Sequence, residues 1–188
     1  MGTRWGMALP LSTVRTLLLL LLATLPWTAD ATTLMKMDVP ALARAADAVV
    51  RCKVVGTSSR WSRDGRRILT DVRLQVLETI AGEAGQELQV VQPGGVVGDI
   101  GQKVDGLAAF ETGEEAVLFL ERRGAVHGVV GMAQGKWRVE EGGAWVRPGP
   151  VEARLVDPRT REPVPPDVAR LPLEQLRATV RAARQVTP

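Results

Sequence analysis

The sequence contains one cysteine, one histidine and no tyrosine, and these shortages limit the chemistry open to the chain. Cys52 alone cannot form an internal disulfide, so the fold must depend on a buried core. We interpret Cys52 as a buried structural thiol, because free cysteine is among the most buried residue types; a nucleophile or an intermolecular disulfide is the alternative. His127 has no histidine partner and no cysteine nearby, which argues against a metal site or a histidine base.

Serine is also scarce once the N-terminal segment is set aside. Ser58, Ser59 and Ser62 are the ones that remain, and no glycine-flanked nucleophile elbow surrounds them. Acidic residues such as Asp99 can still meet in space, but the sequence does not bring two of them to the separation that glycoside hydrolysis needs. We therefore predict no catalytic residue, no metal site and no cofactor, with a hydrolase as the third-ranked reading.

Charge of one sign is not in large excess, since the formal net charge is +3 over 188 residues. A field this weak does not favour a nucleic-acid partner. After residue 31 no apolar run reaches the roughly 20 residues that a membrane-spanning helix needs. We predict no nucleic-acid binding and no transmembrane span in the mature chain.

The N-terminus has the pattern of an export signal. Arg4 and Arg15 precede a leucine-rich run, residues 17–25, and Ala29-Asp30-Ala31 forms a small-x-small cleavage pattern. The pattern predicts a signal peptide over residues 1–31. An exported protein, periplasmic or extracellular, follows from it.

Residues 47–80 give the clearest structural signal. Residues 48–55 and 68–77 alternate with period two and are rich in β-branched side chains, which predicts two long strands. The turn dipeptide Asp64-Gly65 joins them as a hairpin. One face of the first strand, with Val49, Arg51 and Lys53, is expected to be wet. Shorter strands are predicted over residues 87–91, 116–120, 126–132, 134–139 and 144–147. The continuous apolar run of residues 116–120 predicts a central strand covered on both faces.

A helix is predicted near each end of the mature chain. Asp38 can cap a short helix that has Pro40 in its first turn. Residues 171–185 carry an apolar stripe at helical spacing, which favours docking on the sheet over resting on an anionic membrane surface. The predicted domains are a β-barrel domain with an N-terminal helix (32–150), a proline-rich linker (151–170) and a C-terminal helix (171–188).

Two stretches are candidate binding elements. The hairpin tip carries Trp61 and four arginines, which form either a solvated loop or a contact site for an acidic partner. Residues 93–106 are glycine-rich, but no helix follows them as a phosphate-binding loop requires; such a loop on a rigid sheet is a common binding element. The candidate binding residues are Gly94, Gly95, Gly98, Asp99, Gly101, Trp61 and Arg63.

Two further tryptophans flank the turn between the last predicted strands. Trp137 and Trp145 are expected to pair across these strands over an edge of the core. An aromatic platform for carbohydrate is the alternative.

Residues 47–57 followed by 70–82 resemble the opening hairpin of netrin-like modules, the OB-fold domains of tissue inhibitors of metalloproteinases. Residues 110–120 are similar to the "x-Gly-Glu-x-apolar" strand later in that module, and the same arrangement is similar to exported bacterial proteins of unknown function. The resemblance implies a mainly β fold, an OB-like small antiparallel β-barrel with a short helix at each end. The inhibitors chelate zinc through an N-terminal cysteine and carry disulfides. Here Thr32 is the expected first residue and Cys52 stands alone, so inhibition does not carry over.

These observations predict an exported non-enzymatic binding module of the bacterial cell envelope. A barrel face and the glycine-rich loop would contact an envelope protein or polymer. The alternative is a structural accessory subunit of an envelope or surface-appendage assembly, which docks through residues 151–188. The pattern leaves the oligomeric state open.

Overall fold

The long hairpin is the largest pairing in the fold, as the sequence predicts. In the computed structural model, which describes residues 32–185, β2 (Ala48–Trp61) pairs antiparallel with β3 (Ile68–Ala81) along nearly their whole lengths. The turn between them contains Gly65 at a φ of 66°, a conformation that glycine adopts without steric cost. The predicted signal peptide, residues 1–31, lies outside the described residues.

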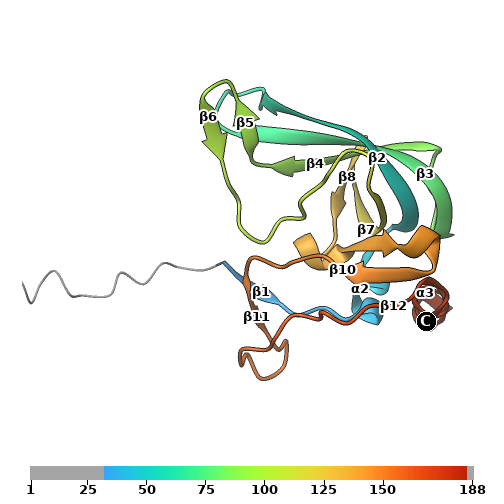
Figure 1. The fold of residues 1–188 in the computed structure, drawn as a ribbon. Helices are drawn as coiled ribbons and strands as arrows, with labels where there is room; N and C mark the ends of the chain where they lie inside the picture. The colour runs from blue at the N-terminus through green and yellow to red at the C-terminus, as the bar shows by residue number, and fades with distance from the viewer. Residues whose placement is uncertain (1–31, 186–188) are drawn as a thin grey trace, which may run out of the picture. The chain divides into compact units, whose positions relative to one another are not determined.

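An eight-stranded sheet is built around this hairpin (Figure 1). Its order is β12-β10-β9-β7-β2-β3-β4-β8, and β7 (Glu115–Arg123) runs antiparallel to β2. β8 pairs antiparallel with β7 and also meets β4 through one parallel pair, Val90 with His127. The other strands of this sheet are β4 (Glu87–Pro93), β8 (Val126–Val129), β9 (Lys136–Glu140), β10 (Trp145–Pro148) and β12 (Leu171–Pro172).

Two small sheets complete the strands. β5 (Gly95–Val97) and β6 (Ile100–Gln102) form a short hairpin within the glycine-rich segment. β1 (Thr33–Met35) pairs in parallel with β11 (Arg154–Val156). The stretch predicted as a linker, residues 151–170, therefore contributes a strand. Two 3₁₀ turns, η1 (Met132–Gly135) and η2 (Glu141–Gly143), connect the later strands.

The central position predicted for residues 116–120 is confirmed. Val117 and Phe119 face one hydrophobic cluster, while Leu118 and Leu120 face a second cluster on the other side of the sheet. All four are fully buried. Because neither face of the strand is exposed to solvent, no position in this run is polar. The same arrangement corrects the wet face expected for the start of β2, because Val49 is fully buried beneath the helices.

Both predicted helices are present. α2 (Val39–Ala45) begins after Asp38, whose carboxylate accepts a hydrogen bond of 2.8 Å from the backbone N–H of Ala41. α3 (Leu173–Gln185) buries its whole apolar stripe in the cluster that contains α2. The last helix therefore docks on its own sheet. Among the described residues no helix is long and apolar enough to cross a membrane.

The expected pairing of the tryptophans is wrong. Trp145 lies opposite Glu140, whereas Trp137 lies opposite Pro148. Glu140, the partner of Trp145, is three residues from Trp137, and residues separated by an odd number on a strand point to opposite faces. The register therefore places the two tryptophan side chains on opposite faces of the sheet. Trp137 is buried. The Trp145 ring is covered by the Arg170 guanidinium, 4.6 Å from the ring centre.

Candidate binding site

The structure brings the two candidate binding stretches together. The backbone N–H of Gly94 donates to the Ile68 carbonyl at 2.8 Å, and the Thr70 hydroxyl donates to the Gly94 carbonyl at 2.7 Å. Figure 1 shows β5 and β6 beside the far end of β2. The glycine-rich hairpin therefore lies next to the tip that carries Trp61.

Gly95 explains why this segment is rich in glycine. A Cβ atom at Gly95 would lie 2.3 Å from the Ser59 Oγ and 2.5 Å from the Thr70 Oγ1, and its φ is 124°. No side chain fits there, because both the space and the backbone conformation require glycine. Gly98 has a φ of 58° and lies in the turn between β5 and β6. A Cβ atom at Gly98 would have no neighbour within 4 Å, so only the backbone conformation favours glycine there.

Trp61, Val96 and Ile100 are exposed at this end, by 37%, 66% and 53%. The turn between β2 and β3 adds three exposed arginines. We call this set the hairpin-tip surface, which consists of Trp61, Arg63, Arg66, Arg67, Val96 and Ile100. Ile100 pairs with Val97 and not with Val96, so Val96 and Ile100 lie on opposite faces of the β5–β6 hairpin. Exposed apolar side chains at one end of a sheet can serve as contact points.

The arginines of the hairpin-tip surface form no ion pair within the described residues, although the charge of Arg67 helps to lower the pKa of Asp64. No side-chain hydrogen bond or ion pair joins Arg63, Arg66 or Arg67 to any residue between 32 and 185. The one acidic residue of the turn, Asp64, accepts hydrogen bonds from the Ser62 hydroxyl at 2.6 Å and the Arg66 backbone N–H at 3.2 Å. These bonds lower the pKa of the Asp64 carboxyl, so it stays charged and engaged in its own turn.

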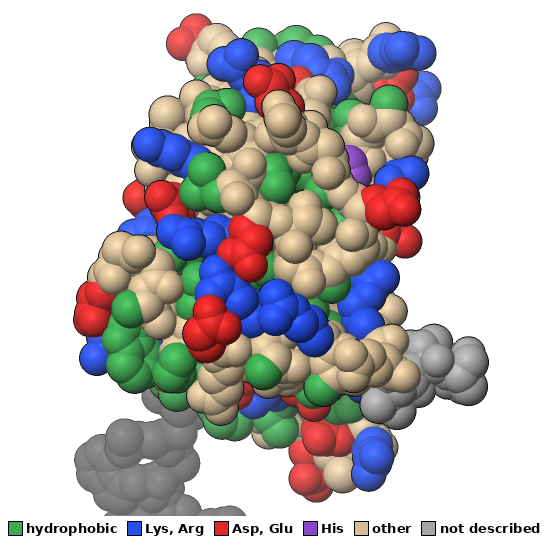
Figure 2. All heavy atoms as spheres, turned by 90° about the vertical axis from the view of Figure 1, so that its right-hand side faces the viewer, with side chains coloured by type: hydrophobic (Ala, Val, Ile, Leu, Met, Phe, Trp, Pro, Cys, Tyr) green, Lys and Arg blue, Asp and Glu red, His purple; other side chains and the backbone are tan. Residues whose placement is uncertain are grey.

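Many other arginines are paired with carboxylates. Figure 2 shows basic and acidic side chains interspersed on one face, with hydrophobic groups small and separated. The pairs include Arg51–Glu115, Arg60–Asp71, Arg138–Glu111, Arg147–Glu140, Arg170–Glu141 and Arg177–Glu78. The three unpaired tip arginines therefore form a local excess of positive charge in a chain that is near neutral.

The remaining candidate residues, Asp99 and Gly101, lie on the glycine-rich hairpin, whereas His127 lies elsewhere. Asp99 and Gly101 are exposed on the β5–β6 hairpin, at or next to the turn that contains Gly98. His127 lies on β8, with its Nδ1 buried and unbonded in the described part of the chain. It lines a separate cleft with Glu83 and Arg122. Between residues 32 and 185 no three His, Cys, Asp or Glu side chains gather to hold a metal.

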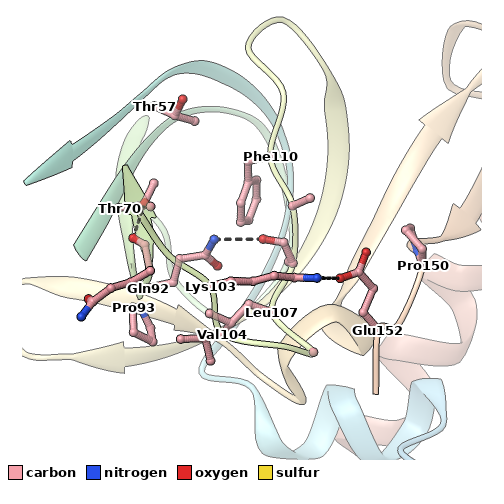
Figure 3. A pocket seen from close by; sticks show the side chains of 16 residues that line it. Thr57, Thr70, Gln92, Pro93, Lys103, Val104, Leu107, Phe110, Pro150 and Glu152 are labelled. Carbon is pink, nitrogen blue, oxygen red and sulfur yellow. Dashed lines mark hydrogen bonds and ion pairs between the residues drawn. The ribbon is translucent and has the colours of Figure 1, made fainter. Parts of the chain in front are cut away.

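A cleft of about 440 Å³ lies beneath the glycine-rich hairpin, and sequence reasoning missed it (Figure 3). Its walls come from β2, β3, the end of β4 and residues 102–110. Thr57, Gln92, Gln102 and Phe110 supply its main side chains. No sequence signal marks them, because they come from separate segments that only the sheet register brings together.

A buried ion pair supports one wall of this cleft. Lys136 Nζ lies 2.5 Å from Glu114 Oε1, and these two side chains are only 9% and 6% exposed. Lys136 also donates to the Ala109 carbonyl and lies over the Phe110 ring, 4.8 Å from its centre. The pair therefore holds residues 109–114 against β9.

Cys52 is a buried thiol, as the sequence predicts. It is fully buried, and its Sγ lies 3.6 Å from the Ala116 carbonyl oxygen. Burial first, and the negative charge of Glu114 second, raise the pKa of the thiol from 9.0 to about 12. The neutral thiol is therefore the form that the folded state holds.

This raised pKa predicts slow thiol chemistry and a loss of stability at high pH. At pH 8 the folded thiol should react with a disulfide reagent about a thousandfold more slowly than the unfolded one. The contribution of Cys52 to stability is complete below pH 9 and is lost as the pH rises from about 9 to about 12. Denaturant titrations across this window should show a steeper loss for the natural protein than for Cys52→Ala. Equal slopes, or fast labelling of the folded protein, would contradict the assignment.

No family model matches the chain, and no curated protein matches its sequence.

Proposed function

We propose that this chain is an exported, non-enzymatic binding module of the bacterial cell envelope, and that the hairpin-tip surface contacts an acidic protein or polymer. One observation carries the proposal. Three exposed arginines that form no ion pair among residues 32–185 lie on the same turn as the exposed Trp61, and the neighbouring β5–β6 hairpin exposes Val96 on one face and Ile100 on the other.

The composition of this surface supports a contact role. Arginine and tryptophan are enriched in protein interfaces and often carry much of the binding energy. Unpaired arginines can meet carboxylate or phosphate groups with two hydrogen bonds each, without first breaking an internal pair. An acidic partner therefore gains charge neutralisation, and its apolar groups can cover Trp61 and Val96.

The proposed scaffold is an OB-like barrel of the kind found in netrin-like modules. Its support is the run of pairings from β7 through β2, β3, β4 and β8 and back to β7. A sheet that returns to its first strand leaves few free edges. Its hairpin loops are then held rigidly, which suits them for recognition.

The alternative role, a structural accessory subunit that docks through residues 151–188, has less support. The apolar stripe of α3 is already covered by the protein's own core. In addition, β11 pairs with β1, and Asp167 is 2.7 Å from Lys36. This segment therefore has internal partners that a docking arm would need to release.

Affinity capture from envelope fractions tests the proposal. The tagged protein should recover a partner at low salt, and recovery should fall as salt screens the arginines. The triple variant Arg63→Ala, Arg66→Ala, Arg67→Ala should recover about tenfold less, since each lost charge contact is worth roughly 0.5 kcal/mol.

The control removes the same charge from elsewhere. Arg122→Ala, Arg154→Ala and Arg181→Ala together alter three exposed arginines outside the hairpin-tip surface. Recovery by this variant should match that of the natural protein. Equal loss in both triple variants, or no specific partner at any salt concentration, would count against the hairpin-tip surface.

A further inference from the structure

The cleft beneath the glycine-rich hairpin is a second site, distinct from the hairpin-tip surface, and we propose that it binds a neutral saccharide. The cleft has a volume of about 440 Å³, within the range of small-molecule sites. In the view of Figure 3, the Phe110 ring lies between Thr57 and the hydrogen bond from Gln92 to the Ala108 carbonyl. The ligand class follows from three properties of this lining.

The first property is charge. Among the described residues that line the cleft, only Lys103 and Glu152 are charged, and they pair with each other at 2.7 Å in exposed positions. Lys103 also lies 3.3 Å from Asp105. A charged ligand would enter the cleft without a free counter-charge, and burying an unpaired charge is costly. The cleft therefore favours a neutral ligand.

The second property is a set of open hydrogen-bonding positions. Gln92 donates from its amide nitrogen to the Ala108 carbonyl at 2.9 Å, and its carbonyl oxygen accepts from no residue between 32 and 185. Gln102 accepts through its carbonyl oxygen from the Ile68 N–H at 2.5 Å, and its amide nitrogen donates to no residue in that range. The Thr57 hydroxyl has no hydrogen bond to any described residue. A hydroxyl, an acceptor and a donor are thus available to a ligand rich in hydroxyl groups.

The third property is an apolar surface beside these groups. Phe110 lines the cleft with Leu107 and Val104. The Lys136 ammonium lies over one face of the Phe110 ring, so only the rest of the ring is left to a ligand. A pyranose has an apolar face of C–H groups and a rim of hydroxyls, so it can contact the ring and the polar side chains together. This combination is the one that the lining offers.

An extended peptide fits the cleft less well. Peptides that add to a sheet need free backbone N–H and C=O groups along a strand edge. On the glycine-rich wall, the Gly94 N–H and carbonyl are already bonded to Ile68 and Thr70. Gly95 is paired with Gln102 across β5 and β6. The backbone at this wall is therefore occupied.

Calorimetric titration with three neutral probes tests the inference. The probes are a tetrasaccharide of N-acetylglucosamine, maltotetraose and an uncharged tetrapeptide with blocked ends. At least one saccharide should bind, and Thr57→Val should weaken it about fivefold through loss of one hydrogen bond. Phe110→Leu should weaken it by a similar factor through loss of the aromatic face.

Matched variants separate this site from its surroundings. Ser58→Ala alters the next exposed hydroxyl of β2, whose side chain points to the opposite face, and it should leave saccharide affinity unchanged. The tip triple variant should also leave it unchanged. Thermal melting of each variant shows whether it folds, and Thr57→Val serves as the test if Phe110→Leu does not.

Each remaining outcome overturns the saccharide site. These outcomes are no heat from either saccharide, tighter binding of the peptide, or the same affinity in Thr57→Val and in the natural protein. Loss of envelope capture in the tip triple variant alone would then leave the hairpin-tip proposal standing. The two proposals can therefore fail separately.

Discussion

Replacing Lys136 by methionine is expected to destabilise the protein by about 3–5 kcal/mol, because it leaves the Glu114 carboxylate buried without its main counter-ion. Glu114 is 6% exposed, so water cannot take the place of the ammonium group. Its Oε1 also accepts from the Glu111 N–H at 2.9 Å, and Arg138 lies 3.2 Å from its Oε2. These contacts reduce the loss and do not remove it. Urea denaturation measures the change.

A double variant distinguishes the cost of an orphaned charge from the value of the pair. Lys136→Met with Glu114→Leu removes both charges, and buried pairs replaced by apolar residues are often close to neutral in stability. The double variant should therefore recover part of the loss, with the remainder due to Arg138 and the Glu111 N–H. Lys103→Met, in the exposed pair with Glu152, should leave the stability close to that of the natural protein. A loss below about 1 kcal/mol for Lys136→Met would show that the pair is not buried in solution.

Leu176→Ala is expected to cost about 2–5 kcal/mol, although Leu176 lies in a C-terminal helix that the sequence places after a linker. Its side chain is fully buried and belongs to the cluster that contains Val49 and Phe119. The loss combines the missing contacts with the cavity that remains. Gln175→Ala, one residue earlier and exposed, should change stability by less than about 0.5 kcal/mol. Chemical denaturation of the two variants gives the comparison.

The same packing changes how a C-terminal deletion should be interpreted. Removing residues 151–188 takes away β11, β12 and α3, and it uncovers one side of β7 and β2. We expect the shortened chain to unfold, so loss of envelope retention would not by itself indicate a docking arm. A shortened chain that melts cooperatively near the natural temperature would restore the accessory-subunit reading. Equal stability of Leu176→Ala and the natural protein would point the same way.

Much of the fold was readable from the sequence because its signals are local. Period-two alternation and Asp64-Gly65 predicted the β2–β3 hairpin, and the unbroken run of residues 116–120 predicted a strand buried on both faces. Asp38 and Pro40 marked the start of α2. Each of these patterns acts within a few residues, so it needs no knowledge of distant partners.

The candidate site was only partly readable. The sequence singled out Trp61, Arg63 and the glycines of residues 93–106, and the structure places these stretches side by side. The reason for glycine at position 95 came from the structure, because it depends on Ser59 and Thr70. The pairing predicted for Trp137 and Trp145 was wrong. The turn between β9 and β10 fixes which residues lie opposite each other, and the turn residues carry no periodic signal that would reveal this register.

By itself, the sequence determined that the chain is built on strands with a helix near each end, that Cys52 is buried, and which segments form the central hairpin. These properties follow from side-chain periodicity and turn chemistry, which are written into neighbouring residues. Only the tertiary structure decided that Lys136 meets Glu114, that β11 pairs with β1, and that Thr57, Gln92 and Phe110 share a cleft. These contacts join residues that are distant along the chain, and strand register fixes them.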